Sequence, residues 1–375
     1  MLPSIALSSS IRRIAICTGG GDAPGLNAVI RAVTLAASKQ GWECYGIRDG
    51  YNGILYPERY PEGGVFRLTP ERVRGIAHLG GTILGTTNKG NPLQFPVPQR
   101  DGTVTHIDRG DDIVGYFARQ GIDALVAVGG DGSLTIAHEL HQRGLRVVGV
   151  PKTIDNDLDK TFTTFGFDTA VSFATECLDR LHSTAESHQR VMVVEVMGRY
   201  AGWIALHAGI AGGAHAILLP EIPFDLDKVA DKIRHRDALG RMYSIVVVAE
   251  GAMPAGGRRA VLEAGDAGRS ERLGGIGEQV ARALGECTGK DARAVVLGHL
   301  LRGGSPTSFD RLASLRFGTA AVRALTHGHS GVMVALAYPD VNYVPLEEVA
   351  GRMKSVPLES DTLHTARDLG ICLGD

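Results

Sequence analysis

Short apolar runs alternate with helix-length amphipathic segments along most of the chain. The runs are rich in Val and Ile and end in glycine or polar residues, which predicts strands over 12–18, 42–47, 122–128, 145–150, 190–196, 216–219, 243–249, 293–297 and 331–337. Residues 26–39 and 169–182 have the apolar spacing of helices, and Gly41 stops the first of them. Repeated strand–helix units predict an α/β fold with doubly wound parallel sheets, and they fit neither an all-β protein nor a helical bundle.

Four segments fall outside this alternation. Residues 91–111 contain three prolines and an Asp-Gly pair, which predicts an exposed excursion that could form a hairpin. Residues 254–274 are rich in glycine and charge and are expected as a surface loop or a short helix with frayed ends. Residues after 337 are expected as a polar helix and tail. Residues 1–11 lack a basic start and an apolar core, so a frayed tail is expected there and not a signal peptide.

Carboxylates follow two of the predicted strands. Asp131 stands in Gly-Gly-Asp-Gly-Ser directly after 122–128, and Asp155 and Asp157 follow 145–150. Parallel α/β sheets bind ligands at the carboxyl ends of their strands, so these carboxylates are expected to converge. They repel one another unless a cation or a proton lies between them, and bare glycine N–H groups can approach phosphate oxygens. The combination favours phosphoryl transfer with a phosphate-bound Mg²⁺, although either motif alone is also typical of a turn or a helix cap.

Other loops between strands and helices carry ligand-type residues. Residues 19–25 form a glycine-rich turn that matches neither dinucleotide nor P-loop spacing, so it could hold phosphate or be only a tight turn. Tyr51 could stack on a base or pack in the core. Arg190 and Arg199 bracket a predicted strand and could bind phosphate or lie solvated. Alone His299 would be structural, but beside Arg302 and a glycine pair a ligand contact is equally reasonable.

Composition narrows the possible classes. The 375 residues suggest two domains, because single cores stop growing near about 250–300 residues. With 39 basic and 41 acidic side chains the net charge is −2, which indicates neither a nucleic acid nor an anionic membrane as partner. No apolar run is long enough to span a membrane. Five scattered cysteines without a C-x-x-C pair indicate no disulfide framework and no zinc site, so the cytoplasm is the default compartment.

Together, these motifs resemble the 6-phosphofructokinase family. The segments GGGDAPGLNAVIR, GGDGS, PKTIDND, GFDTA, SHQR, VEVMGRYAGW, AEGA and GHLLRGGSP occur in that family's order and cover most of the chain. The resemblance implies phosphorylation of fructose 6-phosphate at its 1-hydroxyl in glycolysis, with ATP and Mg²⁺. It also implies two interleaved domains with the active site in the cleft between them: residues 1–166 with 301–350 would bind the donor, and residues 167–300 with 351–375 the sugar phosphate.

The resemblance also implies a role for each site residue. Asp155 would be the general base, Asp131 would hold Mg²⁺ with support from Asp157, Arg199 would stabilise the transferring phosphoryl group, and Thr153 would touch it. The donor site would comprise Gly21, Tyr51, Asn88, Lys89, Gly130, Asp131, Gly132 and Ser133. The sugar phosphate would contact Thr153, Asp155, Met197, Gly198, Arg199, Glu250, His299 and Arg302, together with Arg190 and Arg293 from a neighbouring subunit. A homodimer or homotetramer with shared active sites follows.

The sequence departs from the family pattern at several positions. Asn88, with Lys89 beside it, replaces an arginine that many bacterial members place near the donor phosphates. At effector positions Arg31 is kept, but Leu35 and His182 replace arginines, so the usual regulation by ADP and phosphoenolpyruvate is not expected to carry over.

Two residues give opposite indications of the donor. Gly132 is typical of ATP enzymes, because a side chain there would crowd the nucleotide α-phosphate, whereas Lys152 is typical of enzymes that use pyrophosphate. ATP is favoured, since steric exclusion is hard to evade while a long flexible lysine can swing aside. Pyrophosphate is the alternative.

Other classes fit the motifs less well. A non-catalytic nucleotide-binding regulatory subunit would be expected to lack the base or the arginines, yet Asp155, Asp157 and Arg199 are present. An NAD-dependent dehydrogenase needs a glycine fingerprint followed by an acidic residue, which is absent. NAD and lipid kinases share the GGDG motif but lack the TIDND and MGR segments.

Overall fold

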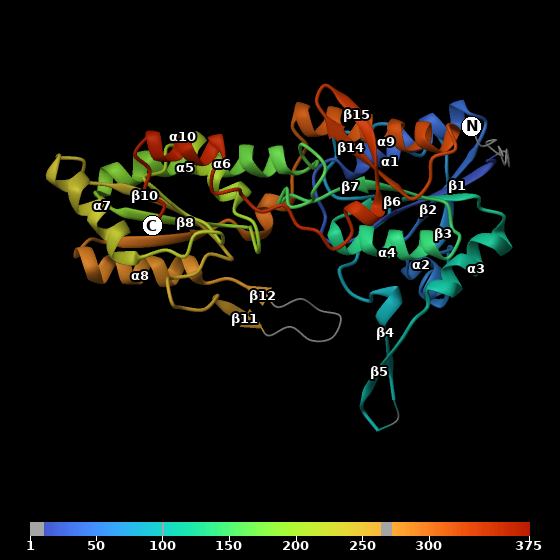
Figure 1. Cartoon of the computed structure of the whole chain (residues 1–375), viewed down its shortest axis with the longest axis horizontal. Helices are drawn as coiled ribbons and strands as arrows, with labels where there is room; N and C mark the ends of the chain where they lie inside the picture. Colours follow the sequence, from blue (N-terminus) through green and yellow to red (C-terminus); the bar gives the residue numbers. More distant parts are fainter. Residues whose placement is uncertain (1–10, 100, 264–271) are drawn as a thin grey trace, which may run out of the picture.

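The computed structural model describes residues 11–99, 101–263 and 272–375. Two sheets, each covered by helices, lie side by side along the long axis of the molecule (Figure 1). The chain builds most of the first sheet, passes to the second after β7, returns after β13 and crosses once more before α10. Within the described ranges, none of the helices combines the length and apolar character that crossing a membrane requires.

The first sheet has seven strands in the order β15-β14-β7-β6-β1-β2-β3. Its five central strands are parallel, while β3 and β15 pair antiparallel at the two edges. In β1, Ile14 and Ile16 face one helical layer, and Ala15 and Cys17 face the other. The strands are β1 (Arg13–Thr18), β2 (Glu43–Ile47), β3 (Val65–Leu68), β6 (Ala124–Gly129), β7 (Val147–Pro151), β14 (Val332–Ala337) and β15 (Asp340–Pro345).

Helices cover both faces of the seven-stranded sheet. On one face α1 (Leu26–Lys39) buries Leu26, Val29, Ile30 and Val33, the i, i+3, i+4, i+7 stripe of an amphipathic helix, and packs on α9 (Ser308–Thr326). On the other face lie α3 (Gly110–Gln120) and α4 (Asp131–Gln142). The short helix α2 (Asn52–Leu55) and the 3₁₀ turns η1 (Pro57–Arg59), η2 (Pro92–Gln94) and η4 (Leu346–Glu348) complete this part.

The second sheet has four strands, all parallel, in the order β13-β8-β10-β9. Its strands are β8 (Val191–Val196), β9 (Ala216–Leu218), β10 (Ser244–Ala249) and β13 (Ala292–Val296). One face is covered by α5 (Phe167–His188), α6 (Trp203–Ala211) and α10 (Asp361–Asp368), and the other by α7 (Leu226–Ala238) and α8 (Ile276–Thr288). The 3₁₀ turn η3 (Gly298–Arg302) connects β13 to the loop that leads into α9.

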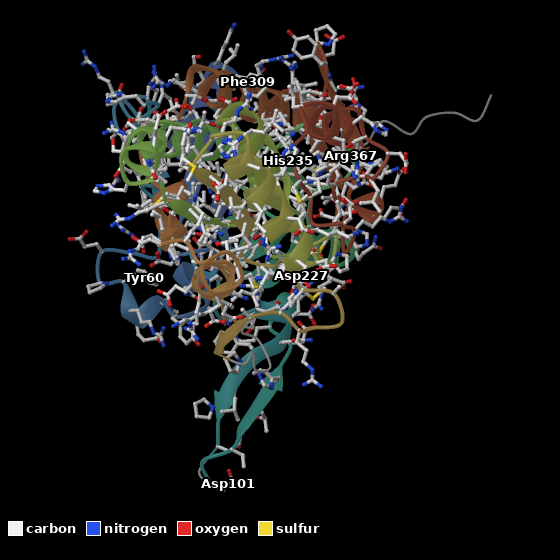
Figure 2. The ribbon with its side chains drawn as sticks, turned by 90° about the vertical axis from the view of Figure 1, so that its left-hand side faces the viewer. Tyr60, Asp101, Asp227, His235, Phe309 and Arg367 are labelled. Atoms are coloured by element: carbon white, nitrogen blue, oxygen red, sulfur yellow. The ribbon has the colours of Figure 1, made fainter. Side chains whose placement is uncertain are left out.

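The predicted excursion at 91–111 is a hairpin. Strands β4 (Phe95–Pro98) and β5 (Val104–Ile107) pair antiparallel and project well beyond the body of the molecule, with Asp101 at the tip (Figure 2). Every residue of β5 is exposed. The prolines of β4 remove backbone donors, which suits a strand with a free edge.

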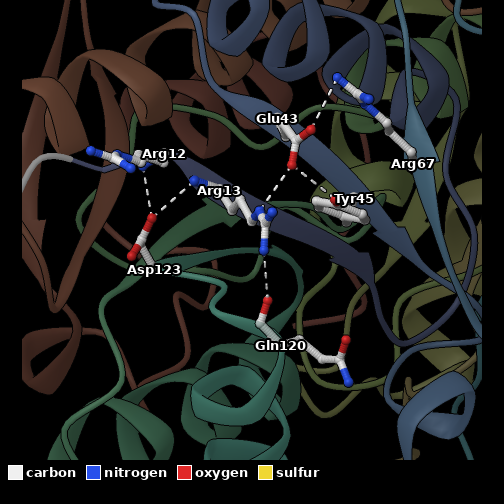
Figure 3. A network of polar contacts seen from close by, with 7 residues as sticks. All are labelled: Arg12, Arg13, Glu43, Tyr45, Arg67, Gln120 and Asp123. Carbon is white, nitrogen blue, oxygen red and sulfur yellow. Dashed lines mark hydrogen bonds and ion pairs between the residues drawn. The ribbon is translucent and has the colours of Figure 1, made fainter.

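Polar contacts secure the start of β1 (Figure 3). Asp123 Oδ2 accepts hydrogen bonds from the backbone N–H groups of Arg12 and Arg13 at 2.7 and 2.9 Å. The Arg13 side chain pairs with Glu43 of β2 at 2.9 Å, and Glu43 also pairs with Arg67 of β3 at 3.2 Å. These contacts fix the register of β1 at the end of the sheet opposite the cavity described below.

The α/β class and doubly wound sheets are confirmed, but three local expectations were wrong. The seven-stranded sheet is not purely parallel, because its two edge strands run antiparallel to their neighbours: β15 returns beside β14 through a tight hairpin connection, and β3 returns beside β2 after the longer segment that holds α2 and η1. Residues 254–274 contain two short paired strands, β11 (Val261–Glu263) and β12 (Arg272–Leu273), with 264–271 outside the described residues. The segment after 337 starts with β15 and not with a helix. The frayed-tail expectation for 1–11 concerns residues that lie, except Ile11, outside the described ranges.

Candidate active site

A cavity of about 490 Å³ lies where the carboxyl ends of the central strands of the first sheet face the second sheet. Its volume is in the range of small-molecule sites. The structure brings together here all predicted catalytic and donor-site residues and two of the sugar-site arginines. They are Gly21, Tyr51, Asn88, Lys89, Gly130, Asp131, Gly132, Ser133, Thr153, Asp155, Asp157, Arg199 and Arg302.

The beginning of α4 and the glycine loop that precedes α1 form one side of the cavity. Helix α4 begins at Asp131 directly after β6, so its first-turn N–H groups, which lack intrahelical acceptors, lie beside the cavity together with Gly132 and Ser133. The loop before α1 contributes Gly19, Gly20 and Gly21. A Cβ at Gly21 would lie 2.6 Å from Arg302 Nη1, so the close approach of this arginine requires glycine.

Gly132 leaves space in the cavity. No heavy atom lies within 4 Å of the position where a Cβ would stand on it, and the residue itself lines the cavity. A larger side chain would therefore enter the ligand space without a clash with protein.

Asp155 is a partly buried residue whose carboxylate has an unused acceptor. Its Oδ1 is buried and has no hydrogen-bond partner, while its backbone N–H donates to Thr153 Oγ1 at 3.1 Å. Burial and the neighbouring Asp157 raise the pKa of Asp155 to about 7, although Arg302 and Arg199 oppose the rise. Burial also raises the pKa of Asp157, which Thr153 counteracts. A carboxylate whose pKa is near neutrality suits proton transfer at physiological pH.

Lys152 lines the cavity but is held in place by the surrounding loops. Its side chain is only 3% exposed, and its Nζ donates to the carbonyl oxygen of Gly21. Burial and Arg302 lower the pKa of Lys152 to about 7, against the opposing effect of Asp22, Asp157 and Asp155. The expectation that this lysine swings aside is wrong, because it is enclosed by the loops that it joins.

Tyr51 mostly belongs to the core. It is 8% exposed and packs in the apolar cluster between the first sheet and α3, although part of its surface lines the cavity. Burial, with Cys17 as the nearest titratable neighbour, raises the pKa of its hydroxyl well above the usual value. Most of the Tyr51 surface therefore packs in the core, as the second of the two predictions for this residue states.

The sugar-site residues of the second sheet follow three parallel strands at one edge. Met197, Gly198 and Arg199 follow β8, Glu250 follows β10, and His299 and Arg302 lie in η3 after β13. Of these only Arg199 and Arg302 line the cavity. Glu250 lies close enough to raise the pKa of Asp155, and burial raises the pKa of Glu250 itself.

Arg190 and Arg293 lie at the opposite end of that sheet. Both pair with Asp291, at 2.5 Å and 2.7 Å, where β8 and β13 begin. The six residues of β8 separate them from the cavity edge by roughly 17–20 Å. They are therefore not part of the cavity of their own chain.

The donor set suits Mg²⁺ bound together with a phosphate ligand. Among residues 11–99, 101–263 and 272–375, no group of three or more His, Cys, Asp or Glu side chains could form an all-protein metal site. Mg²⁺ usually takes one or two carboxylates and completes its shell with water and substrate phosphates. Asp131 Oδ1 already accepts a hydrogen bond from Gly351 N at 2.8 Å, which fixes the orientation of this carboxylate at the start of α4.

The sequence analysis missed part of the lining. Thr87, Asn91, Pro92 and Tyr200 reach the cavity from loops whose course depends on tertiary packing. Lys152 was interpreted only in relation to the donor and not as a site residue, although its place in PKTIDND was the available signal.

Comparison with known proteins gives consistent matches. The phosphofructokinase family model matches residues 13–325. A Chloroflexus aggregans protein, ATP-dependent 6-phosphofructokinase, is 52% identical over 369 residues, covering 98% of this chain and 99% of that protein. An Amycolatopsis methanolica protein, pyrophosphate–fructose 6-phosphate 1-phosphotransferase, is 50% identical over 351 residues, covering 92% and 97%. The T-state crystal structure of Pichia pastoris phosphofructokinase matches with a TM-score of 0.77 at 33% identity, covering 91% of this chain and 35% of that one.

Proposed function

The chain belongs to the phosphofructokinase family, and from that premise we propose that it transfers the γ-phosphoryl group of ATP to the 1-hydroxyl of fructose 6-phosphate. The observation that carries the proposal is the unpartnered Oδ1 of Asp155 in a cavity that is also lined by the first turn of α4, the 19–21 loop and four cationic side chains. Phosphoryl transfer needs little covalent chemistry from a protein beyond positioning, a base and charge stabilisation, which this cavity provides.

In the proposed reaction Asp155 accepts the proton of the sugar 1-hydroxyl while the oxygen of that hydroxyl attacks the γ-phosphorus. The bond to the β,γ-bridging oxygen breaks, and ADP leaves with the electron pair. Arg199 and Arg302 stabilise negative charge on the transferring group, since both line the cavity and both lower the pKa of Asp155. Thr153 holds the Asp155 loop and is available to the same group.

We assign the donor to the first sheet. Its phosphates would lie against the first turn of α4 and the 19–21 loop, with Asn88 and Lys89 at the same wall. Asp131, supported by Asp157, would hold Mg²⁺, which when bound neutralises charge on the β- and γ-phosphates. Residues 1–166 with 301–350 would then form the donor domain.

The sugar phosphate is assigned to the second sheet. Residues 167–300 with 351–375 would form this domain, with Met197, Gly198, Glu250 and His299 beside Arg199 and Arg302 at its edge. Arg190 and Arg293 lie too far from their own cavity to contribute, which supports a homo-oligomer, dimeric or tetrameric, in which a neighbour supplies them. Given the glycolytic reaction, we place the protein in the cytoplasm.

Pyrophosphate is the second candidate donor, because Lys152 is a buried cation beside the donor loop and a pyrophosphate-dependent relative is 50% identical. A coupled assay that follows fructose 1,6-bisphosphate formation, run with ATP and separately with pyrophosphate at saturating Mg²⁺, tests both proposals. Faster turnover with ATP is expected. Faster turnover with pyrophosphate would assign the other donor, and no turnover with either would refute the function.

A further inference from the structure

Residues 351–356, which we call the C-terminal strap, connect the two sheets beside the cavity. The strap follows η4, whose Leu346 packs in the core of the first sheet, and precedes α10, whose Leu363 packs in the core of the second. None of the roles assigned above involves its side chains. Its contacts nevertheless fall on the segments that carry the charged residues of the cavity.

Two backbone groups of the strap bind the carboxylate side of the site. Gly351 N donates to Asp131 Oδ1 and Lys354 N donates to the carbonyl oxygen of Asp157, both at 2.8 Å. Between them Met353 forms an isolated antiparallel bridge with Leu158. The strap therefore holds both the start of α4 and the loop that follows β7.

The Lys354 ammonium binds the same loop with all three of its donors. It donates to Asn156 Oδ1 at 3.1 Å, to Thr161 O at 3.1 Å and to Phe162 O at 3.3 Å. Asn156 is 5% exposed and adopts φ +52°, a left-handed conformation that Asn tolerates better than most residues other than glycine. Because Asn156 stands between Asp155 and Asp157, its conformation sets the directions of both carboxylates.

The strap also binds the loop that presents Arg199. Trp203 Nε1 donates to Lys354 O at 2.9 Å, and the Lys354 ammonium lies 5.6 Å from the centre of the Trp203 ring. Val356 N donates at 2.8 Å to Glu221, whose carboxylate also accepts from Gly202 N at 3.0 Å. Residues 202 and 203 begin α6 and follow Arg199 closely in the chain.

We propose that Lys354 is a positioning residue, which from the strap holds the Asp155–Asp157 loop and the Arg199 loop at the separation that phosphoryl transfer requires. This inference rests on the proposed function. Lys354 does not line the cavity and its ammonium already donates to Asn156, Thr161 and Phe162, so it is not expected to contact either substrate. Its effect is therefore expected on kcat, which depends on the alignment of base, acceptor and phosphoryl group, and not on ground-state binding.

The test compares two substitutions in the strap. Lys354→Met keeps the aliphatic stem beside Trp203 and removes the three donors, whereas Arg352→Met changes an exposed side chain of the same strap. We expect Lys354→Met to lower kcat by about 10- to 100-fold, with both KM values within about threefold, and Arg352→Met to stay within about twofold of the parent. A lower Tm with unchanged kcat, or a raised KM with unchanged kcat, would overturn the proposal.

A fluorescence measurement tests the strap contact without turnover. The chain has two tryptophans, so Trp42→Phe leaves Trp203 as the reporter. In this background Lys354→Met is expected to shift Trp203 emission and to increase its quenching by acrylamide, and Arg352→Met to change neither. An unchanged Trp203 signal contradicts the strap contact itself. Absence of fructose 6-phosphate turnover in the parent refutes instead the proposed function, so the two failures are distinguishable.

Discussion

At the scale of single residues, the site depends on charges that are buried but not fully compensated. Asp155 has a free acceptor oxygen and a raised pKa, and Lys152 has a lowered pKa and a bond to the donor loop. A buried carboxylate and a buried ammonium that both titrate near neutrality are costly to folding, which is typical of functional sites. The first two predictions that follow change the properties of Asp155, and the third adds a charge at Gly132.

Asp155→Asn is expected to lower kcat by several orders of magnitude and to leave the KM for fructose 6-phosphate nearly unchanged. The amide preserves the shape of the side chain but cannot accept the hydroxyl proton. Steady-state kinetics with saturating ATP measure both constants. Activity within about tenfold of the parent would refute the role of Asp155 as general base.

The pH dependence follows from the pKa of about 7 at Asp155. Only the carboxylate form accepts a proton, so kcat/KM for fructose 6-phosphate should fall about tenfold per pH unit below pH 7. The pKa of Asp155 is higher in the folded protein than in the unfolded chain, so protonation of Asp155 stabilises the folded state at low pH. This stabilisation is lost as the pH rises through 7. Asp157→Asn removes a charge that raises the pKa and should move the acid limb to lower pH. If the acid limb of the pH profile does not move in Asp157→Asn, a group other than Asp155 controls it.

Gly132→Asp is expected to lower kcat/KM for ATP by at least about 100-fold, because a carboxylate would enter open ligand space and repel the donor phosphates. The KM for fructose 6-phosphate should change little. Gly132→Ala is the matched control, since its Cβ would contact no protein atom and it adds no charge. If both variants lose ATP turnover equally, the charge is not the cause.

At the scale of elements, helix beginnings and strand ends place the chemistry. One glycine, Gly130, separates the end of β6 from the start of α4 at Asp131. Asp131 and its neighbours therefore reach the cavity from a rigid helix. Strands β8, β10 and β13 are parallel, and they deliver Arg199, Glu250 and Arg302 to one edge. In the first sheet, the strand ends opposite the cavity are held by polar contacts, such as the network around Arg13 and Glu43 (Figure 3).

Asp123→Ala is expected to lower the free energy of unfolding by about 1 kcal/mol, because two backbone N–H groups at the start of β1 lose their acceptor. Asp123→Asn retains a side-chain oxygen and should cost less. Denaturant titration of the parent and the two variants measures the difference, and kcat should not change because the network lies at the far end of the sheet. Equal losses in both variants would indicate that the charge, and not the hydrogen bonds, stabilises β1.

At the scale of the whole molecule, one chain forms a cavity between two sheets but leaves two predicted phosphate ligands elsewhere. Arg190 and Arg293 pair with Asp291 at the end of the second sheet away from the cavity. The proposed shared site between subunits would account for this placement. It would also make activity depend on assembly, since no chain would complete its own site.

Mixed oligomers of Arg190→Ala and Asp155→Asn chains are expected to regain activity that neither variant has alone. A site that takes its base from the first chain and its arginine from the second has both groups intact. The two variants are mixed after partial dissociation, and mixed assembly is verified with distinguishable tags. No recovery in verified mixed oligomers would contradict the shared site.

Local patterns in the sequence determined much of this protein. Apolar runs with β-branched residues predicted the central strands within one or two residues, because burial on both faces of a parallel sheet leaves no polar positions. Carboxylates and glycines at strand ends predicted which residues line the cavity, since all parallel strands of a sheet end at one edge. These are local rules, and they need no knowledge of distant contacts.

Only the tertiary structure decided the rest. Burial turned Lys152 from an expected mobile side chain into a fixed cation, and it moved the pKa of Asp155 toward neutrality. The strap around Lys354 depends on contacts with residues far away in the chain, such as Asp131 and Asn156. Such contacts join segments whose own sequences carry no periodic signal, because their conformation is set by the groups that they meet and not by the residues beside them.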